Sequence, residues 1–139
     1  MAVELKGKFV YSKTANGNFN FRLKASNNET IAVSDGVYPA LKNCKLGIDS
    51  VRKFSVIDKV EDQTVKNYEV LTNPKFELYK DKQDKFRYRL RANNGTLLCI
   101  SEEGYASKAS CKAGILSVGK WAPEAEIYSV EEFEAKYGK

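Results

Sequence analysis

The sequence predicts an α+β protein made of two tandem β-β-β-α-β repeats. Shifting the chain by 67 residues places residues 8–53 on residues 75–120 without a gap, and 17 of the 46 pairs are identical. A repeat at a fixed period is typical of two copies of one structural unit. Within each copy the hydrophobic pattern changes from the alternation of strands to the spacing of a helix. Because units of roughly 60 residues bury little surface alone, we expect both copies to share one core.

Three strand-like segments begin each copy. In the second copy they are Lys75–Lys80, Lys85–Ala92 and Thr96–Ser101. In the middle segment every second residue is apolar and the residues between them are arginines, which predicts one apolar and one basic face. Asparagine-glycine dipeptides at residues 16–17 and 94–95 are typical of tight turns, because both residues tolerate positive φ. We therefore expect an antiparallel meander in each copy.

A helix follows the three strands. From Pro39 to Arg52 the apolar residues recur at spacings of three and four. Pro39 suits a first helical turn, and Ser107 is the expected N-cap of the second-copy helix. Gly47 and Gly114 lie inside the helices at a cost of about 1 kcal/mol each relative to alanine. We therefore expect each helix to approach the sheet closely at its glycine.

An extended segment closes each copy, at about residues 54–60 and 124–130. The chain is expected to form a single domain, residues 1–139. Within it we expect repeat one (7–62), a linker (63–73), repeat two (74–130) and a C-terminal tail (131–139). The tail is expected either to form a short acidic helix or to fray.

Three motifs follow one another in repeat two. They read Phe-Arg-x-Arg-Leu-x-Ala-x-Asn-Gly at residues 86–95, Gly-Tyr-x-Ser-Lys at 104–108 and Gly-Ile-x-Ser-Val at 114–118. Together they resemble the YegP-like family of small bacterial and archaeal proteins, an uncharacterised domain often found in tandem. Repeat one matches more loosely, since residues 36–41 lack the Ser-Lys pair.

The resemblance implies a fold but no activity, cofactor or site. It implies one continuous antiparallel sheet with pseudo-two-fold symmetry, helices on one face and C-terminal strands exchanged between the repeats. A return of each last strand within its own half would leave the same sequence pattern, so both arrangements stay open. Because the tandem chain satisfies the two-fold pairing internally, we expect a monomer.

The sequence argues against an enzyme. It has no histidine, which removes the commonest general base and metal ligand. It also has no phosphate-binding or dinucleotide motif and no CxxC spacing. Cys44 and Cys111 lie on apolar helix stripes and are expected in the core, whereas Cys99 is expected to be more exposed. We therefore expect no catalytic residue, metal or cofactor, and the leading interpretation is a non-enzymatic binding or accessory module of unknown partner.

The basic face of the middle strands is the strongest candidate site. It carries, in the two copies, Arg22, Lys24, Arg87, Arg89 and Arg91. An open basic sheet is one way to bind an anion or single-stranded nucleic acid, which is the alternative function. The competing interpretation is a solvated face paired with carboxylates across the sheet, with Glu77 and Glu126 as candidates.

Charge and composition bound the partners and the compartment. The net charge of +5 permits an anionic partner, either nucleic acid or an acidic protein, without requiring one. No apolar run approaches the roughly 20 residues that span a bilayer, and no membrane partner is expected. The N-terminus lacks a secretory pattern, and the odd number of cysteines favours reduced thiols. We therefore expect a cytoplasmic protein.

Overall fold

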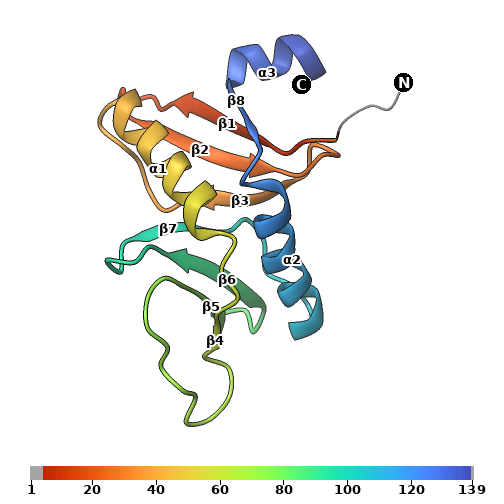
Figure 1. Cartoon of the computed structure of the whole chain (residues 1–139). Coiled ribbons are helices and arrows are strands. Elements are labelled where there is room, and N and C mark those ends of the chain that lie inside the picture. The colour runs from red at the N-terminus through yellow and green to blue at the C-terminus, as the bar shows by residue number, and fades with distance from the viewer. Residues whose placement is uncertain (1–4, 139) are drawn as a thin grey trace.

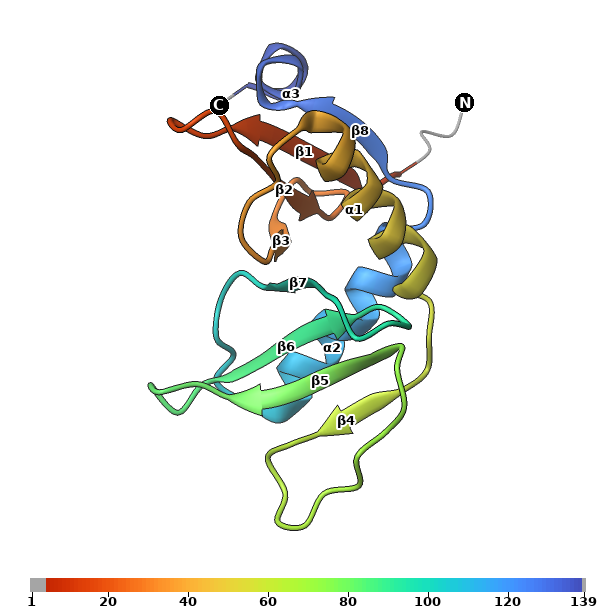
Figure 2. The same ribbon diagram turned by 90° about the vertical axis from the view of Figure 1, so that its left-hand side faces the viewer.

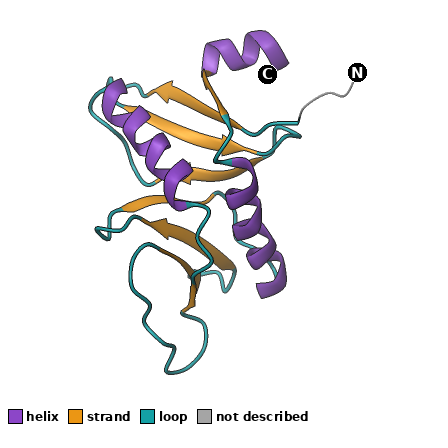
Figure 3. Ribbon diagram, viewed as in Figure 1, coloured by secondary structure: helices purple, strands orange, loops and turns teal. Residues whose placement is uncertain are grey.

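The computed structural model describes residues 5–138, which form one sheet and three helices (Figures 1 and 3). In chain order the elements are β1 (Lys8–Lys13), β2 (Phe19–Lys24), β3 (Thr30–Ser34), α1 (Leu41–Phe54), β4 (Val60–Asp62), β5 (Lys75–Lys80), β6 (Phe86–Arg91), β7 (Leu97–Ser101), α2 (Lys108–Trp121), β8 (Glu126–Ser129) and α3 (Val130–Tyr137).

The sheet joins the two repeats through their third strands. Its strand order is β4-β5-β6-β7-β3-β2-β1-β8, so β3 and β7 pair at the centre of a pseudo-two-fold arrangement. The last strand of each repeat lies in the other half: β4 pairs with β5, and β8 pairs with β1 (Figure 2). The continuous sheet and the strand exchange implied by the resemblance are therefore confirmed.

The structure differs from the expected sheet at its two edges. The six central strands pair antiparallel, but β4 and β8 run parallel to their neighbours, so the sheet is mixed. Parallel neighbours need a long connection rather than a hairpin. The segment at residues 63–74 returns the chain from the end of β4 to the start of β5 in this way.

Helices α1 and α2 cover one face of the sheet and enclose the core (Figure 1). The alternation expected for β6 is confirmed, because Tyr88 and Leu90 are fully buried on this face. The expected close approach of helix to sheet occurs at Gly114, where a Cβ atom would lie 2.9 Å from Cε2 of Tyr88 in β6, whereas the tight contact of Gly47 is with Tyr38, which precedes its helix. A Cβ atom on Gly114 would lie only 2.5 Å from Oη of Tyr105, the tyrosine that precedes the helix.

The helix and strand boundaries between β3 and β5 differ from those expected. Helix α1 spans Leu41–Phe54 rather than starting at Pro39, because Ala40 is the extended N-cap residue. The apolar residues that favoured a strand from residue 54 are partly used by the helix, since Phe54 packs against the core from its last turn. Strand β4 is therefore confined to Val60–Asp62. In α2 the expected N-cap is confirmed, since the Ser107 side chain accepts a hydrogen bond from the Ser110 N–H.

The C-terminal tail forms a helix on the opposite side of the sheet. Helix α3 begins with a capping box, in which Ser129 and Glu132 each bind the other's backbone N–H. Its Phe133 is buried and lines a hollow together with Val10 and Lys24 of the neighbouring strands. The two repeat helices thus share one face as expected, while the tail helix covers part of the other.

Candidate functional site

The face opposite α1 and α2 carries a row of side chains that crosses the whole sheet. The strand register aligns, from one edge to the other, Tyr128, Val10, Arg22, Val33, Ile100, Arg89, Glu77 and Glu61. Arg22 and Arg89 are related by the repeat, and three strand spacings of about 4.8 Å place their Cα atoms roughly 14 Å apart. The structure therefore does not gather the five expected anion-binding residues into one cluster.

In the second half the three arginines are bound to carboxylates. Glu77 is buried and accepts hydrogen bonds from Nε of Arg89 at 2.5 Å and Nε of Arg91 at 2.8 Å. Arg87 donates through Nε to Asp81 at 2.6 Å. Cross-strand pairing with Glu77 was one of the two interpretations of this face, and it describes Arg89 and Arg91, whereas Arg87 is bound by Asp81 in the turn after β5.

Glu126, the second carboxylate considered for that pairing, does not bind an arginine. It accepts a hydrogen bond from the hydroxyl of Tyr128 in the same strand at 2.9 Å. The strand exchange places this strand, β8, beside β1 at the edge of the first half. That part of the pairing expectation is wrong.

A buried ion cluster extends the row to β4. Lys75 Nζ lies 2.6 Å from Oε1 of Glu61 and 3.5 Å from Oε2 of Glu77, and all three residues are buried. Burial alone would raise the pKa of Glu61. Hydrogen bonds from Lys75, Gln63 and the Leu71 N–H outweigh it, so the pKa lies below its usual value. The Glu61 carboxylate is therefore ionised at neutral pH.

The pKa of Glu77 is lowered in the same way. Burial opposes ionisation, and the hydrogen bonds from Arg89 and Arg91 overcome it. Sequence reasoning considered Glu77 but missed Glu61 and Lys75. Glu61 reaches the cluster only because β4 crosses to the other half, and no local pattern in the sequence reports that pairing.

In the first half the counterpart arginine has no such partner. The repeat replaces Glu77 by Val10 and Glu61 by Tyr128. Arg22 is exposed, and its side chain makes no ion pair or hydrogen bond with any of residues 5–138. Arg22 is thus a cation on the open face without the carboxylates that hold Arg89.

Lys24, the neighbour of Arg22 on this face, is bound within its own repeat. Its Nζ donates to Thr30 Oγ1 at 3.0 Å and lies 5.2 Å from the centre of the Phe133 ring. Burial and then the charge of Arg22 lower the pKa of Lys24. The Lys24 amine therefore lies against Thr30 and Phe133 beside Arg22, instead of projecting into solvent.

Two hollows flank Arg22. One of about 280 Å³ lies between β1, β2 and α3, and its lining includes Lys24, Phe133 and Glu134. The other, of about 320 Å³, lies along β2 and β3 and reaches Gly36 and Val37 in the loop that follows. Arg22 lines both hollows, so its guanidinium is available to a group entering either one.

All three cysteines are buried, which corrects the expectation for Cys99. Cys99 lies opposite Leu90 and Ser34 in the register, on the face that the helices cover, and it is fully buried. Burial raises the pKa of its thiol to about 12 and those of Cys44 and Cys111 to about 11. No thiol in the chain is placed to act as a nucleophile.

This burial predicts slow thiol chemistry. Under native conditions at ~pH 8, all three cysteines should react with Ellman's reagent at least about tenfold more slowly than in concentrated guanidinium chloride, because the thiolate is both inaccessible and disfavoured. Absorbance during a stopped-flow experiment would measure the rates. One equivalent of fast-reacting thiol in the native protein would contradict the assignment of Cys99 to the core.

Two further features concern metals and membranes. Within residues 5–138, histidine, cysteine, aspartate and glutamate side chains form no group of three or more that is able to hold a metal ion. None of the helices in this part of the chain has the length and apolar character needed to cross a membrane.

The fold and the repeat define the class, a tandem β-β-β-α-β protein with exchanged edge strands. The model of one family, described as a domain of unknown function (DUF1508), matches residues 15–62 and 81–129, so it covers both copies. The chain belongs to this uncharacterised family, and the resemblance to YegP-like proteins is confirmed.

Relatives and solved structures agree with this assignment. A UPF0339 protein of Pseudomonas aeruginosa is 35% identical over 88% of this chain and 96% of its own length. A UPF0339 protein of Treponema denticola is 54% identical over 40% of this chain and 95% of its own length. The solution structure of yegP from E. coli superposes with a TM-score of 0.71 at 27% identity, covering 93% of this chain and 97% of that one.

Proposed function

We propose that the protein is a non-catalytic binding module that receives a carboxylate of an acidic protein segment at Arg22. One observation carries the proposal: Arg22 is exposed and unpaired within residues 5–138, whereas its repeat counterpart Arg89 is held by Glu77 at 2.5 Å. The same position of the repeated unit thus binds a carboxylate in one half and presents an open guanidinium in the other.

The surroundings of Arg22 favour an acidic segment over a lone anion. The hollows on either side combine apolar surface from Val10, Phe133 and Val37 with the single cation. A peptide can place a carboxylate on the guanidinium and apolar atoms in the hollows, which together give more affinity than a surface ion pair alone.

Single-stranded nucleic acid is the second candidate, supported by the net charge of +5. Against it, Arg87, Arg89 and Arg91 already bind carboxylates, so the row offers few cations to a chain of phosphates. We further propose that the module is a cytoplasmic monomer, because the cysteines are free thiols and each repeat supplies the edge strand that the other needs.

Charge reversal at Arg22 tests the proposal. In titrations of ¹⁵N-labelled protein with acetylated hexaglutamate at low salt, backbone amides of β2 and the adjoining hollows should shift. The substitution Arg22→Glu should weaken binding at least about tenfold, since a charge-assisted hydrogen bond is lost and repulsion is introduced. Lys42→Glu, an exposed position on α1 with the same charge change, is the control.

The same titration with a short oligothymidylate separates the two candidates. Oligothymidylate binding that is tighter than hexaglutamate binding and falls steeply with salt would favour the nucleic-acid function over the acidic segment. Equal weakening of hexaglutamate binding by Arg22→Glu and Lys42→Glu would show that only net charge matters, and would overturn the assignment of Arg22.

A further inference from the structure

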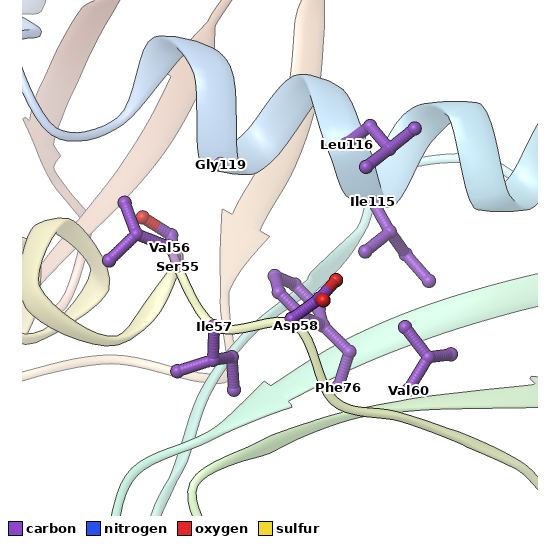
Figure 4. A pocket seen from close by; sticks show the side chains of 9 residues that line it. All are labelled: Ser55, Val56, Ile57, Asp58, Val60, Phe76, Ile115, Leu116 and Gly119. Atoms are coloured by element: carbon purple, nitrogen blue, oxygen red, sulfur yellow. The ribbon is translucent and has the colours of Figure 1, made fainter.

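A groove on the helix-covered side of the second half is open to solvent. It has a volume of about 310 Å³ and lies between α2 and the connection from α1 to β4 (Figure 4). Its floor is apolar and includes Phe76 and Ile115, and the Asp58 carboxylate points across it toward Ile115 (Figure 4). Leu116 and Val56 at its rim are 73% and 63% exposed, which is unusual for large apolar side chains.

In the first half the equivalent space is filled by an arginine of the chain itself. The 67-residue shift relates Gly119 to Arg52, Phe76 to Phe9 and Asp58 to Ala125. The Nη2 atom of Arg52 donates to the carbonyl oxygen of Ala125, and its Cζ lies 5.8 Å from the centre of the Phe9 ring. Its Nε is buried. This half therefore shows what the repeated unit binds at this position.

The second half has the groove but lacks the arginine that fills it in the first half. Glycine at position 119 has no side chain, while Phe76 and Asp58, the counterparts of Phe9 and Ala125, line the groove. The groove cannot be closed easily from position 119, because a Cβ there would lie 2.8 Å from the carbonyl oxygen of Ser55.

Asp58 adds a negative charge to this groove. Its counterpart in the first half, Ala125, is uncharged, and there the carboxylate on the arginine is that of Asp49, whose Oδ1 lies 3.2 Å from Nη1 of Arg52. The side chain of Asp58 forms no ion pair or hydrogen bond with any other described residue, from 5 to 138. The open groove thus places an uncompensated carboxylate beside apolar surface and above the buried Phe76 ring, a combination that suits the charged head and the alkyl stem of an arginine.

We propose that this groove binds an arginine side chain presented by a partner protein. The guanidinium bonds to the Asp58 carboxylate, and the alkyl stem packs along Ile115 and the exposed Leu116, above the buried Phe76 ring. The groove is on the opposite side of the sheet from Arg22, so its occupation does not depend on the function proposed for that residue.

Capped tripeptides test the proposal. Titrating the ¹⁵N-labelled protein with acetyl-Gly-Arg-Gly-amide should shift the amides of Phe76, Ile115 and Gly119. The citrulline peptide, which has the same shape and no charge, should bind at least about tenfold more weakly. The substitution Asp58→Asn should cause a similar loss, and Glu29→Gln, an exposed acidic position in the β2–β3 turn, should cause none.

Three results would overturn the proposal. They are equal binding of the arginine and citrulline peptides, unchanged binding in Asp58→Asn, and tighter binding of free arginine than of the capped peptide, which would indicate a small-molecule ligand instead. A second variant tests the comparison between halves. Arg52→Ala empties the first groove and frees the Asp49 carboxylate that binds Arg52, so the number of ethylguanidinium ions bound per chain should rise from one to two. A constant stoichiometry in the folded variant would refute the equivalence of the two grooves.

Discussion

Replacing Lys75 by methionine is expected to lower the free energy of unfolding at pH 7 by about 3–5 kcal/mol. The lysine lies between two buried carboxylates, 2.6 Å from Glu61 and 3.5 Å from Glu77. Removing its charge leaves Glu61 buried with neutral partners only, and an uncompensated buried charge is among the most costly defects in a folded protein. Urea denaturation followed by circular dichroism would measure the loss.

The same variant has a characteristic pH dependence. The pKa values of Glu61 and Glu77 are lowered in the folded protein, so the stability they contribute is present above about pH 4.5 and is lost as the pH falls through their folded values. In Lys75→Met the part of this contribution that Glu61 owes to Lys75 is absent, while Glu77 keeps its hydrogen bonds from Arg89 and Arg91. The stability gap between wild type and variant should therefore narrow steadily from pH 6 to pH 3.

Lys80→Met provides the matched control, since Lys80 is exposed and its contacts are an ion pair with exposed Asp84 and the Phe86 ring at 5.1 Å. Its loss should change stability by less than about 1 kcal/mol. If the difference in the free energy of unfolding between wild type and Lys75→Met stayed the same at every pH, the lysine would act through packing. The stabilisation assigned to the ion pair of Lys75 with Glu61 would then be wrong.

Gly114→Ala is expected to destabilise the protein by about 1–3 kcal/mol, although the same exchange normally stabilises an exposed helix by about 1 kcal/mol. The new Cβ would lie 2.5 Å from Oη of Tyr105 and 2.9 Å from Cε2 of Tyr88. Neither ring can move away easily. They stack on each other at 6.1 Å, and Tyr88 is fully buried and donates to the carbonyl of Ile31 in the other repeat.

A double-mutant cycle isolates this contact. In the Tyr105→Phe background the hydroxyl is gone, so Gly114→Ala should cost less than it does in the wild type. Ala113→Gly, at the exposed position next to it in α2, should cost about 1 kcal/mol and report ordinary helix propensity. A rise in melting temperature for Gly114→Ala would mean that Tyr105 moves aside at little cost, and that a glycine is not needed at this position for steric reasons.

Features that depend on near neighbours in the chain could be predicted. The alternation of residues 86–91, the Ser107 cap and the helix stripe around Cys111 all follow from local spacing, and the structure shows each of them. The duplication also predicted a shared core. The strand alternation and the helix stripe repeat in both copies, so each half of the sequence supports the interpretation of the other, whereas the serine cap is confined to α2 because Ala40 is the N-cap of α1.

What could not be predicted depends on contacts between distant segments. The burial of Cys99 follows from the pairing of β7 with both β6 and β3, which makes it a central strand beneath the helices. The pairing of Glu61 with Lys75 needs the strand exchange, and the position of α3 depends on where β8 ends. The arginines of the basic face were found from alternation, but whether each meets a carboxylate is decided by strands from elsewhere in the chain.

The joining of both units in one polypeptide has a consequence for how such a protein can diversify. In a two-fold assembly of identical subunits, every substitution appears twice, so a residue cannot serve one purpose on one side and another across the axis. Covalent fusion removes that constraint. Arginine fills one groove while glycine leaves the equivalent groove open, and a guanidinium is paired at one site yet available at the other, so the two halves present surfaces that can change independently.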